Sequence, residues 1–247
     1  MEYKRLAPDF IWLESINSTN NYAAQLLKEG KTQNGTTILT KRQTAGRGQR
    51  GNSWQAEPGL NLTFSVVVYP DMDVKHVFFL NMVVSLAVSK ALEVYYPGPV
   101  SVKWPNDIYV GTHKIAGILV ENQFRGERIV SSVLGIGINV NQENFGPDLR
   151  ATSLRLLTGK NESLEAVFQT CFEQLDFYLN LLMDQQFALL SKQYHEKLLG
   201  VGQRMEFEDE TGVFEGVIVG VDEDGKLKIK RTDGIRKYEL KAVKFLF

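Results

Sequence analysis

The sequence predicts an α+β fold, with a mixed, mostly antiparallel central sheet, helices packed on one side of it and a small β barrel at the C-terminus. Two patterns lead to this prediction. Strand-like runs in the middle of the chain follow one another with only short turns between them, which is typical of antiparallel sheets. After residue 200 the texture changes to short strands separated by turns such as Asp224-Gly225. We therefore expect two domains, at residues 1–200 and 201–247.

The individual elements follow from apolar periodicity and from capping residues. The spacing in 22–27 indicates a helix that begins at Ser18 or Thr19 as N-cap and ends at Gly30, and Ser163 is a natural cap for a later helix. Strands are expected at 10–14, 36–40, 60–69, 100–104, 107–110, 114–121 and 129–140. Further helices are expected at 74–95, 163–183 and 187–199, and barrel strands at 205–208, 213–222, 226–230 and 238–247.

Composition and charge limit the function classes. The 247 residues are 43% hydrophobic and 23% charged, which is ordinary for a soluble globular protein. With 28 Lys and Arg against 29 Asp and Glu, the formal net charge is -1, so no overall basic excess indicates nucleic-acid binding. The single cysteine, Cys171, lies on an apolar helical stripe, and we expect a buried small hydrophobe rather than a nucleophile.

Nothing in the sequence indicates export or membrane insertion. The first nine residues lack the apolar segment and cleavage site of a secretory signal. The most hydrophobic window, 77–88, is too short to span a bilayer and is interrupted by Asn81 and Ser85. We therefore expect a cytoplasmic protein.

Residues 43–54, with the sequence QTAGRGQRGNSW, are the most informative stretch of the chain. Glycines there allow positive φ and close backbone approach, arginines grip carboxylates or phosphates, and Trp54 offers a flat face to a ring. A flexible polar surface loop is the plain alternative. The glycine pattern also has the letters of a dinucleotide-binding fingerprint, but a strand at 60–69 follows instead of the required helix. A kinase-type glycine loop lacks its partner motifs.

Other polar residues stand at strand ends and turns inside apolar runs. Each has a plain alternative: Ser18-Thr19-Asn20 as a helix cap, residues 103–107 as a turn with an exposed lysine, Gly117 as a bulge, and Asn139 as a partner for a buried backbone group.

Taken together and in order, these motifs resemble the biotin protein ligase family. The matching segments are Ser18-Thr19-Asn20, 43–48 with Trp54, 103–107, 114–119 and 135–139. Residues 150–154 and the terminal barrel are also similar, so the resemblance covers nearly the whole chain. It implies a class II synthetase-like catalytic domain followed by an SH3-like barrel.

The resemblance also implies roles for single residues. Biotin would be bound by Ser18, Thr19, Asn20, Gln43, Gly46, Arg47, Lys114 and Gly117. The nucleotide would be bound by Arg50, Trp54, Asn106, Asp107, Asn139 and Thr152, with Trp54 stacked on adenine. Catalysis would fall to Arg47, Lys103, Asp107 and Lys114, and Asp107 would also be the ligand for Mg²⁺.

The implied reaction has two steps and uses biotin, ATP and Mg²⁺. The biotin carboxylate attacks the α-phosphate of ATP to give biotinyl-5'-AMP, and a lysine of a biotin carboxyl carrier domain, in acetyl-CoA carboxylase or a related carboxylase, then takes the biotinyl group. Because a carboxylate and a triphosphate repel each other, this reaction needs fixed cations, which Arg47, Lys103 and Lys114 supply.

Two departures from the family pattern matter. The family loop often has a second arginine where this chain has Gln49, so we expect a leakier intermediate or compensation from Arg50. The catalytic pattern begins by Phe10, so we expect no N-terminal helix-turn-helix and no DNA binding. A homodimer that pairs sheet edges is a further expectation.

Two other functions stay open at this point. One is a lipoate or octanoate ligase or transferase of related fold, which needs a pocket for an aliphatic chain. The other is a non-catalytic nucleic-acid or peptide-binding module built on the basic loop and the barrel.

Overall fold

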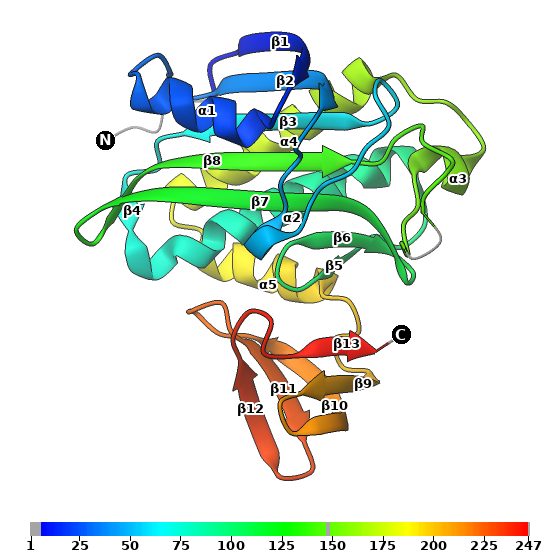
Figure 1. Ribbon diagram of the computed structural model, residues 1–247. Helices are drawn as coiled ribbons and strands as arrows, with labels where there is room; N and C mark the ends of the chain where they lie inside the picture. Colours follow the sequence, from blue (N-terminus) through cyan, green and yellow to red (C-terminus); the bar gives the residue numbers. More distant parts are fainter. Residues whose placement is uncertain (1–5, 147–148, 247) are drawn as a thin grey trace.

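The larger part of the protein is a mixed sheet with helices on both faces (Figure 1). The computed structural model describes residues 6–146 and 149–246, without the side chain of Arg50. In these residues the main sheet has eight strands. Their order across the sheet is β1 (Asp9–Ile16), β2 (Thr36–Gln43), β3 (Leu62–Val68), β8 (Arg128–Ile138), β7 (His113–Arg125), β6 (Asp107–Val110) and β5 (Ser101–Lys103), and the short β4 (Met72–Asp73) pairs with β8. Only β1 and β2 pair parallel in this described sheet, so the predicted mixed, mostly antiparallel sheet is confirmed.

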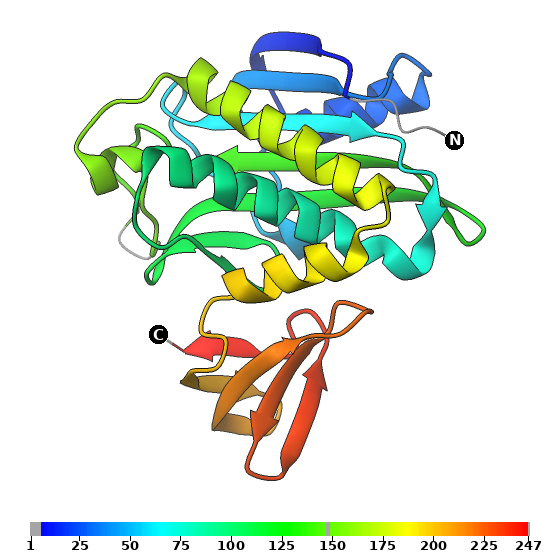
Figure 2. The same cartoon turned by 180° about the vertical axis from the view of Figure 1, so that it is seen from behind.

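The helices lie on both sides of this sheet (Figures 1 and 2). Helices α2 (Val77–Tyr95), α4 (Leu164–Met183) and α5 (Phe187–Lys197) lie on one side, and α1 (Thr19–Lys28) lies on the other. In β3, Phe64 and Val66 pack in the core with the first group, whereas Val67 packs in a second cluster with Leu26 of α1. The prediction of helices on one side is therefore wrong for α1, because a strand buried at every position needs cover on both faces.

Most element boundaries agree with the sequence, and the differences occur where capping side chains or turns interrupt the chain. The predicted helix at 74–95 begins as a 3₁₀ turn, η2 (Val74–His76), whose N-cap is Asp73. A short helix, α3 (Leu154–Thr158), was not predicted; its N-cap is Ser153. The strand expected at 238–247 is instead β12 (Gly234–Tyr238) and β13 (Lys244–Leu246), because residues 239–243 turn between them, and Phe247 lies outside the described residues.

The C-terminal region forms a separate five-stranded antiparallel sheet in the described residues. Its other strands are β9 (Arg204–Asp209), β10 (Gly212–Val221) and β11 (Leu227–Arg231), in the order β12-β11-β10-β9-β13. Hydrogen bonds attach it to the larger unit: among them, Trp104 Nε1 donates to Gly225 O at 2.9 Å, and Val221 N donates to His195 Nε2 at 2.8 Å. The barrel is therefore docked beside α5 and the β5–β6 turn (Figure 1).

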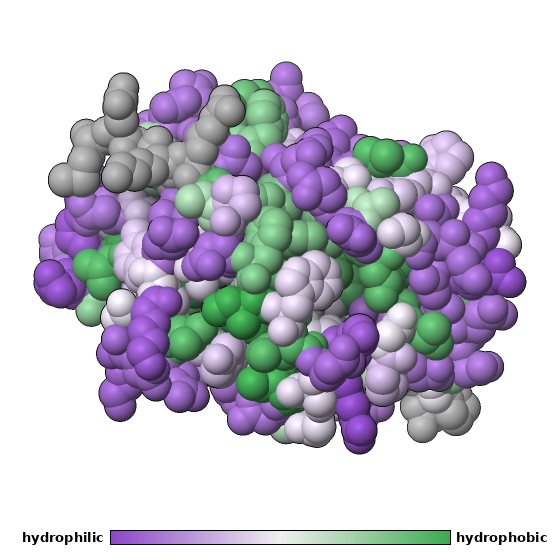
Figure 3. All heavy atoms as spheres, turned by 90° about the horizontal axis from the view of Figure 1, so that it is seen from above, coloured by the Kyte–Doolittle hydropathy of each residue, from purple (hydrophilic) through white to green (hydrophobic). Residues whose placement is uncertain are grey.

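Strand β1 forms one edge of the main sheet and carries partly exposed aromatic side chains. Seen from above in Figure 3, apolar surface gathers in the middle of this face and hydrophilic residues surround it. Trp12 is 56% exposed although its ring packs edge-on against Phe168 of α4, with the centroids 6.2 Å apart. This edge therefore presents backbone groups and apolar side chains without cover from another described strand.

Residues Val74–Tyr95 form the one described helix that is long and apolar enough to cross a membrane by length and composition. Most of it, 72% of the apolar window, is buried inside the protein. Helix α2 packs against α4, α5 and the sheet, and it contributes much of the main core. Its hydrophobicity is thus accounted for by the core of a globular fold.

Cys171 lies on α4 and is completely buried, as predicted. Burial raises the pKa of its thiol to about 12. Because the thiolate is the reactive form, we expect the native protein to show no reaction with a disulfide reagent at pH 8, and one thiol per chain after unfolding. The absorbance of the thiolate that the reagent releases measures the reaction of the native and of the unfolded protein. A stoichiometric reaction of the native protein would contradict this burial.

Candidate active site

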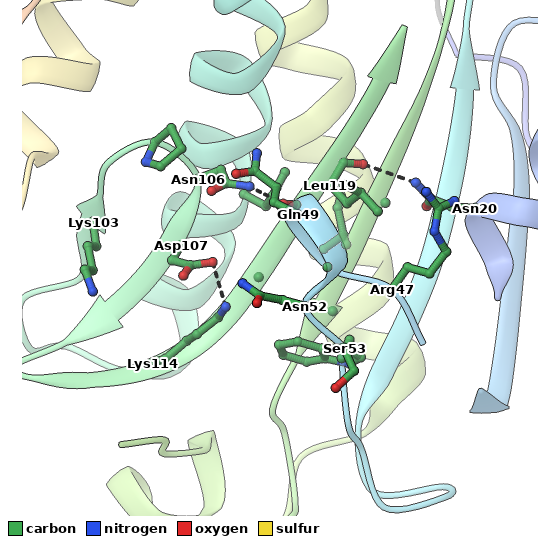
Figure 4. Close-up of a pocket in the computed structure, with 18 of the residues that line it drawn as sticks. Asn20, Arg47, Gln49, Asn52, Ser53, Lys103, Asn106, Asp107, Lys114 and Leu119 are labelled. Carbon is green, nitrogen blue, oxygen red and sulfur yellow. Dashed lines mark hydrogen bonds and ion pairs between the residues drawn. The ribbon is translucent and has the colours of Figure 1, made fainter. Parts of the chain in front are cut away.

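A cavity of about 440 Å³ lies on the face of the main sheet that α1 partly covers. Strands β7 and β8 form its floor, and its rim comes from the start of α1, residues 43–54, the β5–β6 turn and residues 240–245. Among the residues proposed from sequence, the cavity brings together Ser18, Thr19, Asn20, Gln43, Arg47, Trp54, Lys103, Asn106, Asp107, Lys114 and Gly117. Segments that are far apart in the chain thus meet in one site (Figure 4).

Three glycines keep the floor of the cavity free of side chains. A Cβ atom at Gly137 would lie less than 3.0 Å from the Trp54 indole, and one at Gly135 less than 3.0 Å from the Asn20 amide. At Gly117 the distance to Trp54 Cζ3 would be 3.1 Å. Each glycine therefore makes room for a neighbouring side chain. The plain alternative for Gly117, a bulge, is not what the structure shows, because Gly117 pairs regularly with Asp107 and the irregular register between β6 and β7 falls at 108–109.

Residues 43–54 fold as a short hairpin over the cavity, which we name the 43–54 hairpin. Gly48 N donates to Asn52 O at 2.7 Å and Trp54 N donates to Gly46 O at 3.0 Å. A 3₁₀ turn, η1 (Gln49–Gly51), forms the tip. The base is tied to the end of β1 by bonds from residues 44 and 45 to the carbonyls of residues 16 and 17. Strand β3 follows, so the helix that a dinucleotide fingerprint needs does not occur there.

Two cations of the site are held in ion pairs with carboxylates. Lys114 Nζ lies 2.7 Å from Asp107 Oδ1, as Figure 4 shows, and Arg47 Nη2 lies 2.7 Å from Glu121 Oε1. All four side chains keep about a third or more of their surface exposed, so solvent reaches them. The pairs therefore fix where the positive charges stand, and each contributes little to the stability of the fold.

Lys103 occupies a drier part of the rim. Its Nζ lies 5.2 Å from the ring centroids of both Tyr109 and Phe245. Burial lowers the pKa of Lys103, and burial also raises the pKa of Tyr109 to about 12. Phe245 belongs to the C-terminal unit, so this lysine stands between the two parts of the protein.

The start of α1 supplies a polar wall. Ser18 caps the helix by accepting from Asn21 N, and it also lines the cavity, so the capping and the binding interpretations are compatible. Thr19 N donates to Gln43 Oε1 at 2.8 Å, which joins the helix start to the base of the 43–54 hairpin. Hydroxyl and amide groups here offer both donors and acceptors to a ligand.

Other proposed residues are not part of the cavity wall in the described structure. Asn139 Nδ2 donates to Thr152 O at 3.0 Å, and Thr152 N donates to Lys114 O at 2.9 Å, so both support the strand end that carries Lys114. Gly46 lies at the neck of the hairpin, where a Cβ would collide with the Trp54 carbonyl. The side chain of Arg50 lies outside the described part of the structure.

The sequence did not reveal the contribution of the C-terminal unit. Leu240, Lys241, Val243, Lys244 and Phe245 line the cavity, although no motif marks them. The weak signal available was the alternation of apolar and basic residues at 243–245, which is typical of a strand with one face against a partner. Glu121 and Ser65, which hold wall residues in place, were also missed.

The donor set is compatible with Mg²⁺ that arrives with a nucleotide. Asp107 is the only carboxylate among the described residues that line the cavity, and the Asn106 amide beside it donates to Ile118 O. Mg²⁺ keeps several waters and is commonly held by one or two carboxylates together with substrate phosphates. No cluster of three His, Cys, Asp or Glu side chains suited to a metal occurs among the described residues.

Comparison with known proteins identifies the family. Residues 12–139 match the biotin/lipoate A/B protein ligase family, and residues 200–239 match the biotin protein ligase C terminal domain. The bifunctional ligase/repressor BirA of Bacillus spizizenii is 32% identical over 234 residues, which cover 92% of this chain and 71% of that protein. The biotin–acetyl-CoA-carboxylase ligase of Paracoccus denitrificans is 34% identical over 52% of this chain and 53% of that protein.

The structural comparison agrees. Biotin protein ligase from Aquifex aeolicus, solved in complex with biotin and ATP, superposes with a TM-score of 0.80 at 30% identity, covering 96% of this chain and 99% of that one. The fold, a mixed sheet followed by a separate C-terminal β unit, is that of the biotin protein ligases. The chain belongs to the biotin/lipoate A/B protein ligase family.

A test of the cavity floor is the substitution Gly137→Ala. Because the new Cβ would overlap the indole, we expect the Trp54 side chain to be displaced from the cavity floor. The far-UV circular dichroism should stay unchanged. In a Trp12→Phe background, with Trp104 buried, iodide quenching of tryptophan fluorescence should rise. Gly146→Ala is the control, since a Cβ there meets nothing within 4 Å. Equal quenching in both variants would contradict this packing.

Proposed function

We propose that this protein is an ATP-dependent ligase that activates biotin as biotinyl-5'-AMP and transfers the biotinyl group to a lysine of a biotin carboxyl carrier protein. The observation that carries the proposal is the cavity, which brings the fixed cations Arg47 and Lys114 together with a polar wall and the Trp54 indole. The family membership and the Aquifex relative solved with biotin and ATP support it.

The polar wall favours biotin over lipoate. Biotin carries a ureido group, with two N–H donors and a carbonyl acceptor, at the end opposite its carboxylate. Ser18, Thr19 and Gln43 offer hydroxyl and amide groups that can pair with such a ligand. An aliphatic or dithiolane end would leave these groups unpaired, and sites built to hydrogen-bond a substrate discriminate strongly against analogues that lack the partner.

The first step joins two anions, and the cations of the site offset their repulsion. A carboxylate oxygen of biotin attacks the α-phosphorus of ATP, the bond to the bridging oxygen breaks, and pyrophosphate leaves with the electron pair. Arg47 and Lys114 hold positive charge near the reacting groups, with Lys103 on the nucleotide side. Fixed charge of this kind is worth about 3 to 4 kcal/mol per group in comparable sites. Mg²⁺, when bound with ATP, supplies further positive charge to the phosphates, and Asp107 would hold it.

The second step needs no nucleophile from the protein. The amine of the acceptor lysine attacks the acyl carbon of the mixed anhydride, AMP leaves with the bonding electrons, and the amine loses a proton. Water would destroy the intermediate, so the cavity has to be covered while it waits. The 43–54 hairpin and residues 240–245 lie where such a cover is needed. Asn139 and Thr152 act in this scheme through the strand end of Lys114.

The wider setting follows from the same proposal. Residues 1–200 form the catalytic domain and 201–247 the barrel, and the acceptor is a carrier domain of acetyl-CoA carboxylase or a related carboxylase, as the name of the Paracoccus relative suggests. Such carboxylases and the reduced, buried Cys171 are consistent with a cytoplasmic location. The exposed edge of β1 is the surface on which two copies would pair.

Biotin-dependent exchange of labelled pyrophosphate into ATP tests this function directly. We expect exchange with biotin and none with lipoate or octanoate, because only biotin pairs with the polar wall. Exchange with lipoate alone would favour the lipoate ligases of the same family. Absence of exchange with either acid would favour a binding module and contradict the proposal.

Lys114→Ala should reduce pyrophosphate exchange at least about a hundredfold, because it removes a cation fixed beside the reacting groups. The melting temperature should stay within a few degrees of wild type, since the side chain is partly exposed at a strand end. Lys31→Ala is the matched control. This lysine is also paired with a carboxylate, but it is exposed and does not line the cavity. Near-normal exchange in Lys114→Ala would remove this residue from the mechanism.

Gln49→Arg should retain the adenylate longer than wild type, because the tip of the hairpin would gain a charge that faces the phosphate. We expect release of labelled biotinyl-5'-AMP to slow by about threefold, within the range for a partly exposed ion pair. Rapid filtration after dilution into unlabelled adenylate gives the rate. Identical release rates in the two proteins would mean that Gln49 does not limit retention.

A further inference from the structure

Glu121 on β7 connects three separate parts of the molecule, although it lies outside the cavity wall. Its carboxylate accepts from Arg47 Nη2 at 2.7 Å and from Arg47 Nη1 at 3.2 Å. Asn20 Nδ2 donates to the same carboxylate at 2.9 Å. The residue therefore joins the 43–54 hairpin and the start of α1 to the floor of the cavity.

The contacts of Arg47 are more specific than a single surface ion pair. Both terminal nitrogens of the guanidinium face the Glu121 carboxylate, and Nη1 also donates to Asn21 Oδ1 at 2.6 Å. A two-pronged arrangement of this kind fixes the orientation of the arginine as well as its position. In the hairpin Arg47 lies opposite Ser53, the residue before Trp54, so its position also constrains where the indole is placed.

A second line of hydrogen bonds runs from Glu121 into the polar wall. The Asn20 side-chain nitrogen donates a hydrogen bond to Glu121. Its side-chain oxygen is therefore left as the acceptor for the Ser65 hydroxyl, at 2.6 Å. Ser65 Oγ is completely buried and lies 2.7 Å from Thr19 Oγ1. Thr19 N in turn donates to Gln43 Oε1. One carboxylate thus orients the arginine and, through Asn20, the side chains expected to meet the ureido end of biotin.

We propose that Glu121 is a positioning residue that latches the 43–54 hairpin to the cavity floor and orients the biotin-binding side of the site. The proposal rests on the proposed function for the identity of the ligand, but the latch itself does not. Glu121 acts through Arg47 and Asn20, and it touches no reacting atom. Its loss would loosen the hairpin at Arg47 and weaken biotin binding more than ATP binding, because Arg47, Asn20 and Thr19 are the residues assigned to biotin. On the nucleotide side Trp54 packs on Gly137 and Asp107 lies on β6, and neither of these contacts involves Glu121.

Limited digestion with trypsin tests the latch without any activity measurement. Arg47 and Arg50 are cleavage sites within the hairpin, and cleavage requires local opening. In Glu121→Gln we expect cleavage after these two residues to be about threefold faster than in wild type, measured by mass spectrometry of the fragments. Glu215→Gln is the matched control, since Glu215 pairs with Arg204 in the barrel. Equal cleavage rates in wild type and Glu121→Gln would overturn the latch.

Steady-state exchange kinetics test the effect on the ligand. Glu121→Gln should raise the KM for biotin about fivefold and leave the KM for ATP within twofold, a split that general destabilisation would not produce. Added to Arg47→Ala, the same substitution should raise the biotin KM less than twofold further, because its main partner is already gone. A full fivefold increase in that background, or equal changes for both substrates, would overturn the positioning role. If no exchange occurs at all, the proposed function fails while the digestion still decides on the latch.

Discussion

The site depends on how closely Trp54 and Asn20 approach strands β7 and β8, and this approach is possible only where the strands carry no side chains. Gly117, Gly135 and Gly137 face the α1 side, while their neighbours Ile118 and Ile136 point to the core. The period of two along each strand thus gives one packed face and one open face. A central sheet that is covered on both sides can leave room for a ligand in this way.

The second constraint is electrostatic. Arg47 and Lys114 are each matched by a carboxylate, so neither of these two positive charges stands unpaired in the partly enclosed space. Because about a third or more of each side chain is exposed, solvent screens these pairs, and their main effect is to hold the cations in place. In the proposed function, an anionic ligand would have to share the cations with Glu121 and Asp107, which would moderate its affinity and keep the cations in position between turnovers.

Local sequence patterns made the helices and strands predictable. Contacts between residues far apart in the chain could not be predicted in this way. Ser163 was identified as a cap, and Ser18 as one of two candidates with Thr19, because a cap needs only a few neighbouring residues. Lys114 was placed in the site because residues 114–119 form one of the local motifs on which the family resemblance depends. The partner of Arg47 is 74 residues away, and Gly137 beneath Trp54 and the rim residue Phe245 lie farther still along the chain. Such contacts arise from tertiary packing, which no local pattern encodes.

Strand β13 makes the cavity depend on the C-terminal unit as well as on the main sheet. Because residues 240–245 complete the rim, the cavity is the joint product of two folding units rather than of the larger one alone. A lesion in the barrel core, for instance at the buried Phe207, touches no ligand yet would loosen the docking of that rim. In a mutational scan scored by enzyme activity, substitutions in the barrel should therefore lower activity more often than the number of barrel residues near the substrates would predict.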